Sequence, residues 1–433
     1  MNHHGIKGRV VSTTALIASA TLFLAGCSAA SGSSGSSDGH TISVASRWTT
    51  GTSEGIFLAD YAAEFEKSTG ISVDIIDGGE EMDNTVETAT AAGQAPDVVI
   101  VNLFDKTLGW LDAGVTVDVN DYLTDWGLES RISEAATSQW RVDESSDGKL
   151  RGFPFSGFAW PIWYNTELLS SAGIDSIPTT TDELIVAAKA LRAAGVAPMI
   201  AGGNDWTGQK LFYQIIQSYT DAKTIQDTMQ EGTYCSTPDV YKGIELFAEL
   251  TAAGVFADNV EGLTSEDMNN TYYSQKAAIM SAGSWAFRGA VEAGNGIVEA
   301  TQLGGFPLPS GASHSAPTAY QGFSNAGFMV TKSGAENNID AVQEFISGFY
   351  TDEMQSTFVN AGNNVSVGIS DLSGAATDPL LGQALSLGDA VDYVVLPDVW
   401  IGTASEPITQ VTSMAFGGAD AEKICAGLDS ASK

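Results

Sequence analysis

The stretch Pro96-Asp97-Val98-Val99-Ile100-Val101 (PDVVIV) decides the fold of this chain. Its four consecutive aliphatic residues are typical of a strand buried on both faces, as in a parallel sheet covered by helices. Upstream, strands are predicted at residues 42–45 and 71–76, and helices at 55–67 and 82–92. This alternation of strands and helices predicts an α/β fold with a parallel sheet and helices on its faces.

The α/β pattern occurs a second time downstream. The stretch Thr179-Thr180-Thr181-Asp182-Glu183 offers a capping signal before a predicted helix at 184–194, which Gly195 ends. Strands are predicted at 160–164, 198–201, 277–280, 303–307 and 327–330, and helices at 166–172, 208–220, 238–253, 265–274, 339–349 and, for the most part, 408–428. The sequence therefore predicts two α/β blocks, with the chain returning to the first.

The N-terminus has the pattern of an export signal. Lys7 and Arg9 precede an apolar run that ends in Leu24-Ala25-Gly26-Cys27, so residues 1–26 are predicted to be a signal peptide. The run is shorter than the roughly 20 residues of a membrane span. The tetrapeptide resembles a bacterial lipobox, in which Cys27 would be lipid-modified; an ordinary signal peptide with a chance cysteine is the alternative. Residues 27–40 are Ser/Gly-rich and predicted to be a lipid-anchored linker, which puts the protein outside the cytoplasm on the cell membrane.

The charge of the chain restricts its ligands. Lys and Arg total 19 against 53 Asp and Glu, a net charge of −34, and removing Lys7 and Arg9 with the signal peptide makes it −36. Such a surface repels nucleic acid and anionic lipid, so we expect no nucleic-acid partner and a neutral or cationic ligand. We find no Cys/His spacing typical of a metal site, no P-loop and no nucleophile elbow, and we expect no metal, cofactor or catalytic residue.

Six stretches then occur in a familiar order. They are residues 65–73, 95–99, 164–184 with Tyr164-Asn165 and Pro178-Thr179-Thr180-Thr181-Asp182-Glu183-Leu184, 273–285 with Gly283-Ser284-Trp285, 306–309 and 322–330. From about Thr41 to the C-terminus the chain resembles the extracellular solute-binding proteins of bacterial ABC importers, in the sugar-binding family that includes maltose-binding protein. The resemblance implies a periplasmic-binding-protein-like fold, with two α/β lobes and a ligand cleft at the hinge.

The resemblance also implies where the chain passes between lobes. Crossings are expected near residues 155–160, 320–325 and 363–368. Lobe one would comprise residues 41–156 plus 324–364, and lobe two residues 160–320 plus 369–433. Cys235 and Cys425 would both lie in lobe two, which favours a disulfide over two buried thiols.

Sugars present C–H faces to aromatic rings and hydroxyls to acids and amides, and ligands of open α/β sheets bind beyond the carboxyl ends of strands. By their place after predicted strands and by the resemblance, Trp206, Trp285 and Trp400 are the leading candidates, with Trp206 expected in a Gly/Asn/Asp loop. The other candidates are Trp48, Trp160, Tyr320, Asn102, Phe104, Asp105, Asp205 and Glu54. Trp110, Trp126, Trp140 and Trp163 are assigned to packing.

The resulting hypothesis is a monomeric lipoprotein that captures a carbohydrate, an oligosaccharide by the number of candidate rings, and delivers it to an ABC permease. Two alternatives stay open. The same fold could bind a polyamine, peptide or other cationic solute if Asp105, Asp205 and Glu54 converge. An extracellular glycoside hydrolase would need two carboxylates that face each other across a bond.

Overall fold

The computed structural model of the chain describes residues 41–101, 105–141, 148–362, 365 and 376–433. Segments 1–26 and 27–40, predicted to be the signal peptide and the linker, lie outside the described residues, and so does Cys27. None of the helices in the described ranges is long and apolar enough to cross a membrane.

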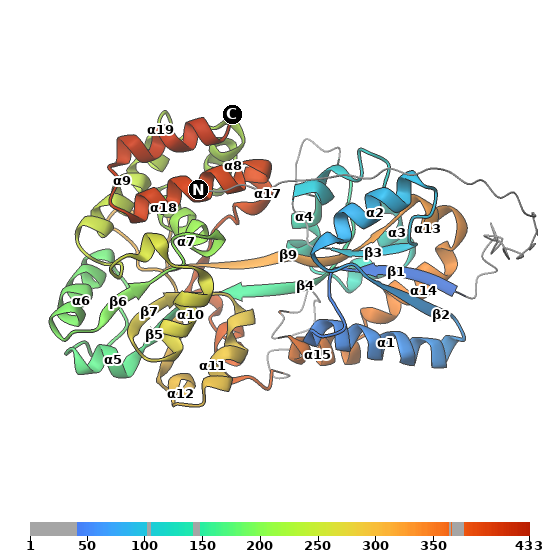
Figure 1. Cartoon of the computed structure of the whole chain (residues 1–433), viewed down its shortest axis with the longest axis horizontal. Helices are drawn as coiled ribbons and strands as arrows, with labels where there is room; N and C mark the ends of the chain where they lie inside the picture. The colour runs from blue at the N-terminus through green and yellow to red at the C-terminus, as the bar shows by residue number, and fades with distance from the viewer. Residues whose placement is uncertain (1–40, 102–104, 142–147, 363–364, 366–375) are drawn as a thin grey trace, which may run out of the picture. The chain divides into compact units, whose positions relative to one another are not determined.

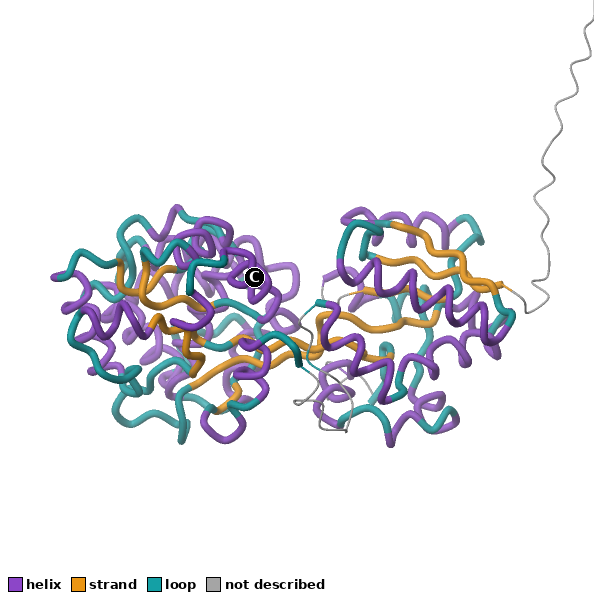
Figure 2. Tube along the Cα trace, turned by 90° about the horizontal axis from the view of Figure 1, so that it is seen from below, coloured by secondary structure: helices purple, strands orange, loops and turns teal. Residues whose placement is uncertain are grey.

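The first sheet is built around the aliphatic stretch Val98–Val101. This stretch forms β3 (Val98–Val101), which is buried along its whole length and pairs in parallel with β1 (Thr41–Ser46); β1 in turn pairs in parallel with β2 (Ser72–Asp77). The sheet has the order β10-β9-β3-β1-β2, with β4 paired to β9. Helices lie on both faces of these strands (Figure 2). The predicted parallel core is confirmed, but β9 extends it in the antiparallel direction.

Helices of the first lobe connect and cover these strands. Thr52 caps α1 by accepting a hydrogen bond from the Gly55 N–H, and Gly70, with φ +78°, ends the helix. The helices are α1 (Ser53–Thr69), α2 (Met82–Ala91), α3 (Asn120–Asp125), α4 (Glu134–Arg141), α13 (Lys332–Asn337), α14 (Ile339–Phe349) and α15 (Asp352–Ala361).

The second sheet has the order β6-β7-β5-β8 and mixes parallel and antiparallel pairs. Its strands are β5 (Ile162–Asn165), β6 (Ala197–Ile200), β7 (Ala277–Ser281) and β8 (Thr301–Gly304). Along β5, Ile162 and Tyr164 join one buried cluster and Trp163 another, as the two-residue period of a strand requires. Both faces are therefore covered, which explains why β5 and β7 are uniformly buried.

Helices surround the second sheet as well. Within the capping signal predicted at residues 179–183, Thr180 and Glu183 form the capping box that starts α6. Hydrogen bonds from the Thr179 and Thr180 N–H groups lower the pKa of the Glu183 carboxyl. The helices of the second lobe are α5 (Thr166–Ser171), α6 (Thr181–Ala193), α7 (Trp206–Ile216), α8 (Ala222–Glu231), α9 (Pro238–Ala252), α10 (Ser265–Tyr273), α11 (Phe287–Ala293), α12 (Ile297–Ala300), α16 (Pro379–Leu385), α17 (Asp398–Ile401), α18 (Ser405–Phe416) and α19 (Ala421–Ala431).

Two long strands lead from one sheet to the other. β4 (Phe153–Trp160) and β9 (Thr318–Val330) pair antiparallel, and both are visible in Figure 1. β9 starts where Thr318 pairs with Phe306 and β10 (Asp392–Tyr393), and it ends beside β3. β4 ends at Trp160 and β5 begins at Ile162, so the single strand predicted at 160–164 is wrong. Pro161 between them lacks the N–H that a continuous ladder needs.

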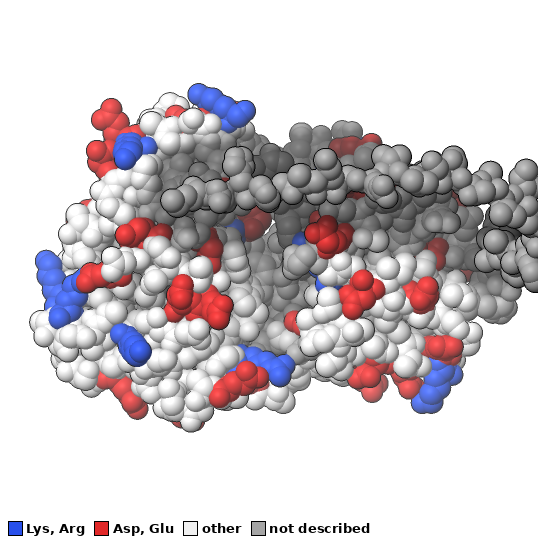
Figure 3. Space-filling model, in the orientation of Figure 1, with Lys and Arg blue, Asp and Glu red and all other residues white. Residues whose placement is uncertain are grey.

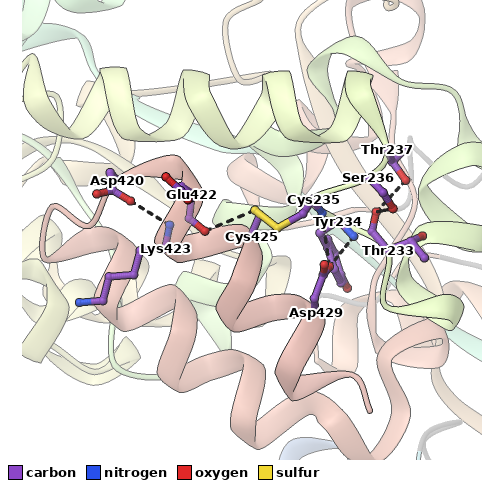
Figure 4. Close-up of a disulfide and its surroundings, with 10 residues drawn as sticks. All are labelled: Thr233, Tyr234, Cys235, Ser236, Thr237, Asp420, Glu422, Lys423, Cys425 and Asp429. Carbon is purple, nitrogen blue, oxygen red and sulfur yellow. Dashed lines mark hydrogen bonds between the residues drawn. A yellow bond between two sulfur atoms is a disulfide. The ribbon is translucent and has the colours of Figure 1, made fainter.

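Cys235 and Cys425 are joined by a disulfide across 190 positions of sequence. It ties α19 to the segment between α8 and α9 (Figure 4). The Asp429 carboxylate, one turn along α19, accepts hydrogen bonds from the Tyr234 N–H at 2.7 Å and the Cys235 N–H at 3.3 Å. The C-terminal helix is thus attached at two neighbouring points.

Candidate functional site

Three tryptophans that are distant in sequence lie together in the second lobe. Ring centroids of Trp206 and Trp285 are 5.6 Å apart, and Trp160 lies 5.5 Å from the first and 5.0 Å from the second. Trp206 is 44% exposed and Trp285 39%, whereas Trp160 is buried. Two indole rings therefore present open surface to solvent, with the third beneath them.

Trp206 is the first residue of α7, not part of a loop as the sequence predicted. Asp205 caps this helix: its carboxylate accepts hydrogen bonds from the Thr207 N–H at 2.9 Å, from the Thr207 hydroxyl and from the Ser265 N–H. The cap allows the helix to begin directly after the Gly-Gly-Asn turn. These three hydrogen bonds fix the start of α7, of which Trp206 is the first residue, and connect it to the start of α10.

Trp285 lies folded back over Gly283. A Cβ atom at Gly283 would come within 2.1 Å of the Trp285 ring, so a side chain and the ring cannot share this space. The backbone of Gly283, with φ −80° and ψ 170°, is extended and open to any residue. Glycine is therefore required here for the position of the ring and not for a turn.

Trp160 packs against both exposed rings, and Tyr320 packs against Trp160. Trp160 Nε1 donates to Ser281 Oγ at 3.0 Å, and the Tyr320 hydroxyl donates to the Lys210 carbonyl at 2.9 Å. Both rings are buried, in a small cluster with Phe158 and Val394, and their centroids are 6.1 Å apart. In this structure they position other groups and offer no open face to a ligand.

A pocket of about 450 Å³ borders both exposed rings, between α10 and α11; we call it the α10–α11 pocket. Its volume lies in the range of roughly 300–1,000 Å³ that ligand pockets occupy. The lining residues are Trp206, Thr207, Ser265, Glu266, Met268, Asn269, Asn270, Tyr273, Ala282, Gly283, Trp285, Ala286 and Gly289.

A second pocket, of about 820 Å³, uses Trp285 as a shared wall; we call it the α1–α11 pocket. Glu54, near the start of α1, lines it together with Arg288 of α11. Burial raises the pKa of the Glu54 carboxyl, while its own backbone N–H and the charge of Arg288 act in the opposite direction. Its lining residues are Gly51, Thr52, Glu54, Trp285, Arg288, Val291, Glu292, Asn360, Ala361, Gly362, Thr377, Asp378 and Pro379.

Trp400 lies elsewhere. It belongs to α17 and lines a third pocket of about 470 Å³ with Gln139 and Arg141 of α4 and Gln321 of β9. Neither Trp206 nor Trp285 contributes to this pocket. The sequence grouped the three tryptophans as one set, and the structure distributes them over different pockets.

The remaining candidates differ in how they are placed. Trp48 packs on Phe155 and Phe358, with centroid distances of 5.3 and 5.9 Å, and is half-buried in the first lobe. Asn102 and Phe104 lie outside the described residues; Asp105 begins a short 3-10 turn, and its side chain is not described. Trp110, Trp140 and Trp163 are buried, and Trp126 stacks between Tyr122 and Phe153, which confirms their packing roles.

Apart from Trp206, Trp285 and Glu54, the residues that line these two pockets were not predicted from the sequence; Asn269, Gly283 and Arg288 are among them. Asn269 and Arg288 lie on helices, where a polar residue usually indicates a solvated face. The Gly-Ser-Trp stretch was the available signal for Gly283.

Acidic side chains are spread over the face drawn in Figure 3, with fewer basic ones among them. The net charge of −34 is therefore not concentrated in one patch of this face. Within the described residues, no three His, Cys, Asp or Glu side chains form a group that could hold a metal ion.

A protein with two α/β lobes, open tryptophan faces and adjoining pockets has the construction of a small-molecule receptor. The chain belongs to the bacterial extracellular solute-binding protein family, which residues 49–356 match. The predicted fold class and family are thereby confirmed.

Individual relatives agree with this assignment. The chain is 37% identical to a probable secreted solute-binding lipoprotein from Streptomyces coelicolor, with a TM-score of 0.85 over 91% of this chain and 99% of that one. A chitin oligosaccharide binding protein is 22% identical, with a TM-score of 0.75 over 90% of this chain and 98% of that one, and shows the shared fold. A probable sugar-binding periplasmic protein of Rhizobium meliloti (strain 1021) is 25% identical over 212 residues, 48% of this chain and 49% of the relative. The chain thus spans about half the length of this curated relative.

Proposed function

We propose that this protein is the substrate-binding lipoprotein of an ABC importer and that it captures a neutral carbohydrate. The observation that carries the proposal is the pair of half-exposed rings, Trp206 and Trp285, which are 5.6 Å apart and backed by the buried Trp160. Exposing two adjacent indoles is unfavourable in water unless a ligand covers them. The sugar-binding name of the Rhizobium relative supports the same ligand class.

The polar groups around the rings suit sugar hydroxyls. Asn269 and Asn270 line the pocket on one side of Trp285, and Thr52 and Glu54 line the pocket on the other side. Amides, hydroxyls and carboxylates donate and accept the directional hydrogen bonds that a hydroxyl requires. The ligand is bound and released without a chemical step, as the membership of a solute-binding family supports.

A cationic solute is the less favoured ligand. Asp205 uses its carboxylate to cap α7 and to bind the Ser265 N–H, and it does not line the α1–α11 pocket. Glu54 lines that pocket with Glu292 and Asp378, but Arg288 lies among these acids and pairs with Glu292 at 2.8 Å. Asp205 and Glu54 therefore do not converge on one point, as an amine site built on both acids would require.

The proposed lobes are residues 41–156 plus 324–364 and 160–320 plus 369–433, with β4 and β9 as two of the three crossings. Of the third, at 363–368, only Val365 is described, and it pairs with Gly157 of β4. Closure of the lobes by bending at these strands would enclose the sugar and present it to the permease.

Calorimetric titration of the full-length protein tests the ligand class. The panel contains glucose, galactose, maltose, maltotriose, cellobiose, cellotriose, xylobiose and N,N′-diacetylchitobiose, with spermidine and a tripeptide as other classes. We expect at least one sugar to bind, and Trp206→Ala and Trp285→Ala each to weaken it about tenfold or more. Tyr393→Ala, at an aromatic residue that is 44% exposed outside these pockets, is the matched control. Binding of spermidine or the peptide with no binding of any sugar would refute the proposal.

The anchor is tested separately. Cys27→Ala should move the protein from the membrane fraction to the soluble extracytoplasmic fraction and reduce uptake, because tethering raises the concentration of captured sugar at the permease. Its affinity for the sugar should stay unchanged. A loss of affinity would show that the folded body begins earlier than Thr41.

A further inference from the structure

The α10–α11 pocket differs from the α1–α11 pocket in that only the second lobe lines it. Met268, Ala282 and Ala286 supply buried apolar surface, and the Tyr273 hydroxyl donates to the Ala286 carbonyl at 2.6 Å. Gly289 makes room for this tyrosine, because a Cβ atom there would lie 2.7 Å from the ring. The walls are thus fixed by packing in one lobe, so the pocket exists without lobe closure.

Asn269 is the unusual member of this wall. Its Oδ1 is withdrawn from solvent and, within the described part of the chain, accepts no hydrogen bond. A buried oxygen without a partner costs free energy, and such groups in folded proteins call for an explanation. Rotation about the broad χ2 torsion of asparagine would turn the amide toward a group in the pocket without any backbone movement.

Trp285 connects this pocket to the α1–α11 pocket, since it lines both. A chain of sugar units that stacks on Trp285 would therefore reach Glu54 of the first lobe on one side and Asn269 on the other. A single sugar unit can occupy only one of these pockets at a time.

We infer that the α10–α11 pocket is a subsite for one unit of an oligosaccharide, and that Asn269 selects this unit by accepting a hydrogen bond from one of its hydroxyls. The inference rests on the proposed function and narrows its ligand to sugars of at least two units. Binding of the hydroxyl supplies the partner that Asn269 Oδ1 otherwise lacks.

The experiment compares Asn269→Leu with the unaltered full-length protein, using titration against glucose, maltose and maltotriose and against the corresponding series of every other sugar that binds. The expected result is affinity that rises from one unit to two, and a loss of roughly tenfold for the longer sugar in the variant, the usual effect of one hydrogen bond to a buried group. Affinity for the single unit should change much less. Asn337→Ala, at an exposed asparagine of α13 in the first lobe, is the control.

Thermal unfolding of the same variant separates a binding role from a structural one. Leucine has a similar size and removes the unpaired oxygen, so the melting temperature without sugar should be equal or higher while affinity falls. If Asn269→Leu does not fold, Asn269→Asp serves instead: it keeps the acceptor and should retain the preference for longer sugars.

The outcomes are distinguishable. Equal affinity for one and two units overturns the subsite and leaves the proposed function standing. The same holds for an unchanged length preference in Asn269→Leu while Trp285→Ala weakens binding of the sugar. A lower melting temperature of Asn269→Leu with unchanged affinity for the sugars would give Asn269 a structural role only, and this result also overturns the subsite. Failure of every sugar to bind overturns both proposals.

Discussion

Lys210 Nζ lies 2.8 Å from Asp398 Oδ1, and this ion pair joins the helix that begins with Trp206 to the short helix that carries Trp400. Gln217, just beyond the end of α7, reinforces the connection: its amide donates to the Val395 carbonyl and accepts from the Val395 N–H. Polar side chains of α7 and of the turn after it therefore set the position of residues 395–400, although Trp206 and Trp400 line separate pockets.

The two ends of this ion pair should respond differently to mutation. The Lys210 side chain is 4% exposed and that of Asp398 34%, so Asp398→Asn leaves a buried ammonium group without its counter-charge. We expect Asp398→Asn to lower the free energy of unfolding by about 3 kcal/mol. Lys210→Met leaves only a partly hydrated carboxylate and should cost about 1 kcal/mol. Urea denaturation of both variants measures the difference in the free energy of unfolding. Equal losses in the two variants would show that the unequal burial of the two charges does not govern their effect on stability.

Gly283→Ala should impair binding without impairing folding. The added Cβ would overlap the Trp285 ring at 2.1 Å, whereas the extended backbone at this position accepts alanine. The ring must turn away, and we expect the affinity for the bound sugar to fall about tenfold, as for the loss of the ring itself. Gly262→Ala is the control, because no atom lies within 4 Å of the position that its methyl group would take. Titration and tryptophan fluorescence report the change; wild-type affinity in Gly283→Ala would show that the ring position is not set by this glycine.

Glu54 should make stability depend on pH in a defined direction. Burial raises its pKa in the folded protein above the usual value, so the folded state holds the proton more tightly than the unfolded chain. Protonated Glu54 therefore contributes to the free energy of unfolding at pH values below its pKa in the unfolded chain. This contribution is lost as the pH rises through the higher pKa of Glu54 in the folded protein. Glu54→Gln should therefore be more stable than the unaltered protein at pH 7, with the advantage disappearing toward pH 4.

Denaturation curves of Glu54→Gln at several pH values between these limits measure the effect. Glu344→Gln, at an exposed position of α14, shows what the removal of one surface charge does by itself. An advantage of Glu54→Gln that grows as the pH falls would have the wrong sign for a raised pKa.

The disulfide should stabilise the protein without affecting the site. Cys235 and Cys425 close 190 positions of sequence, and removal of a native disulfide typically costs about 2–5 kcal/mol. The double variant Cys235→Ala/Cys425→Ala should lose stability in this range, and its affinity for the bound sugar should be unchanged. Asp429 still attaches α19 through the Tyr234 N–H, so we expect the helix to remain docked. An equal loss of stability and affinity would mean that α19 shapes the site.

The sequence predicted the elements of this fold well where local rules act alone. The Val98–Val101 run became a fully buried strand, and the capping signal predicted at residues 179–183 contains the Thr180–Glu183 box that starts α6. It failed at Pro161, where one predicted strand is divided between two sheets, and at Trp206, where a cap by Asp205 turns a predicted loop into the start of a helix. Pro161 and the Asp205 cap are local features that the pattern of apolar residues did not reveal, whereas the Ser265 N–H that Asp205 also binds lies 60 positions away.

The candidate site was likewise predictable from the sequence only in part. That exposed tryptophans would follow strands of the second lobe was predictable, because strand ends and loops can be read from local pattern. Two features were not predictable from the sequence. Trp206 and Trp285 share a pocket that Trp400 does not line, and Asn269 joins them from a helix.

The sequence by itself determined an α/β chain with an acidic composition and tryptophans after its strands, and it predicted an export signal. Hydrophobic period, capping residues and charge act over a few neighbouring positions, and so they can be read without coordinates. Only the tertiary structure decided which rings lie together, which backbone N–H of α10 the Asp205 carboxylate binds and which asparagine oxygen lacks a partner within the described residues. These depend on contacts between residues tens to hundreds of positions apart, such as Lys210 and Asp398, whose proximity no local pattern encodes.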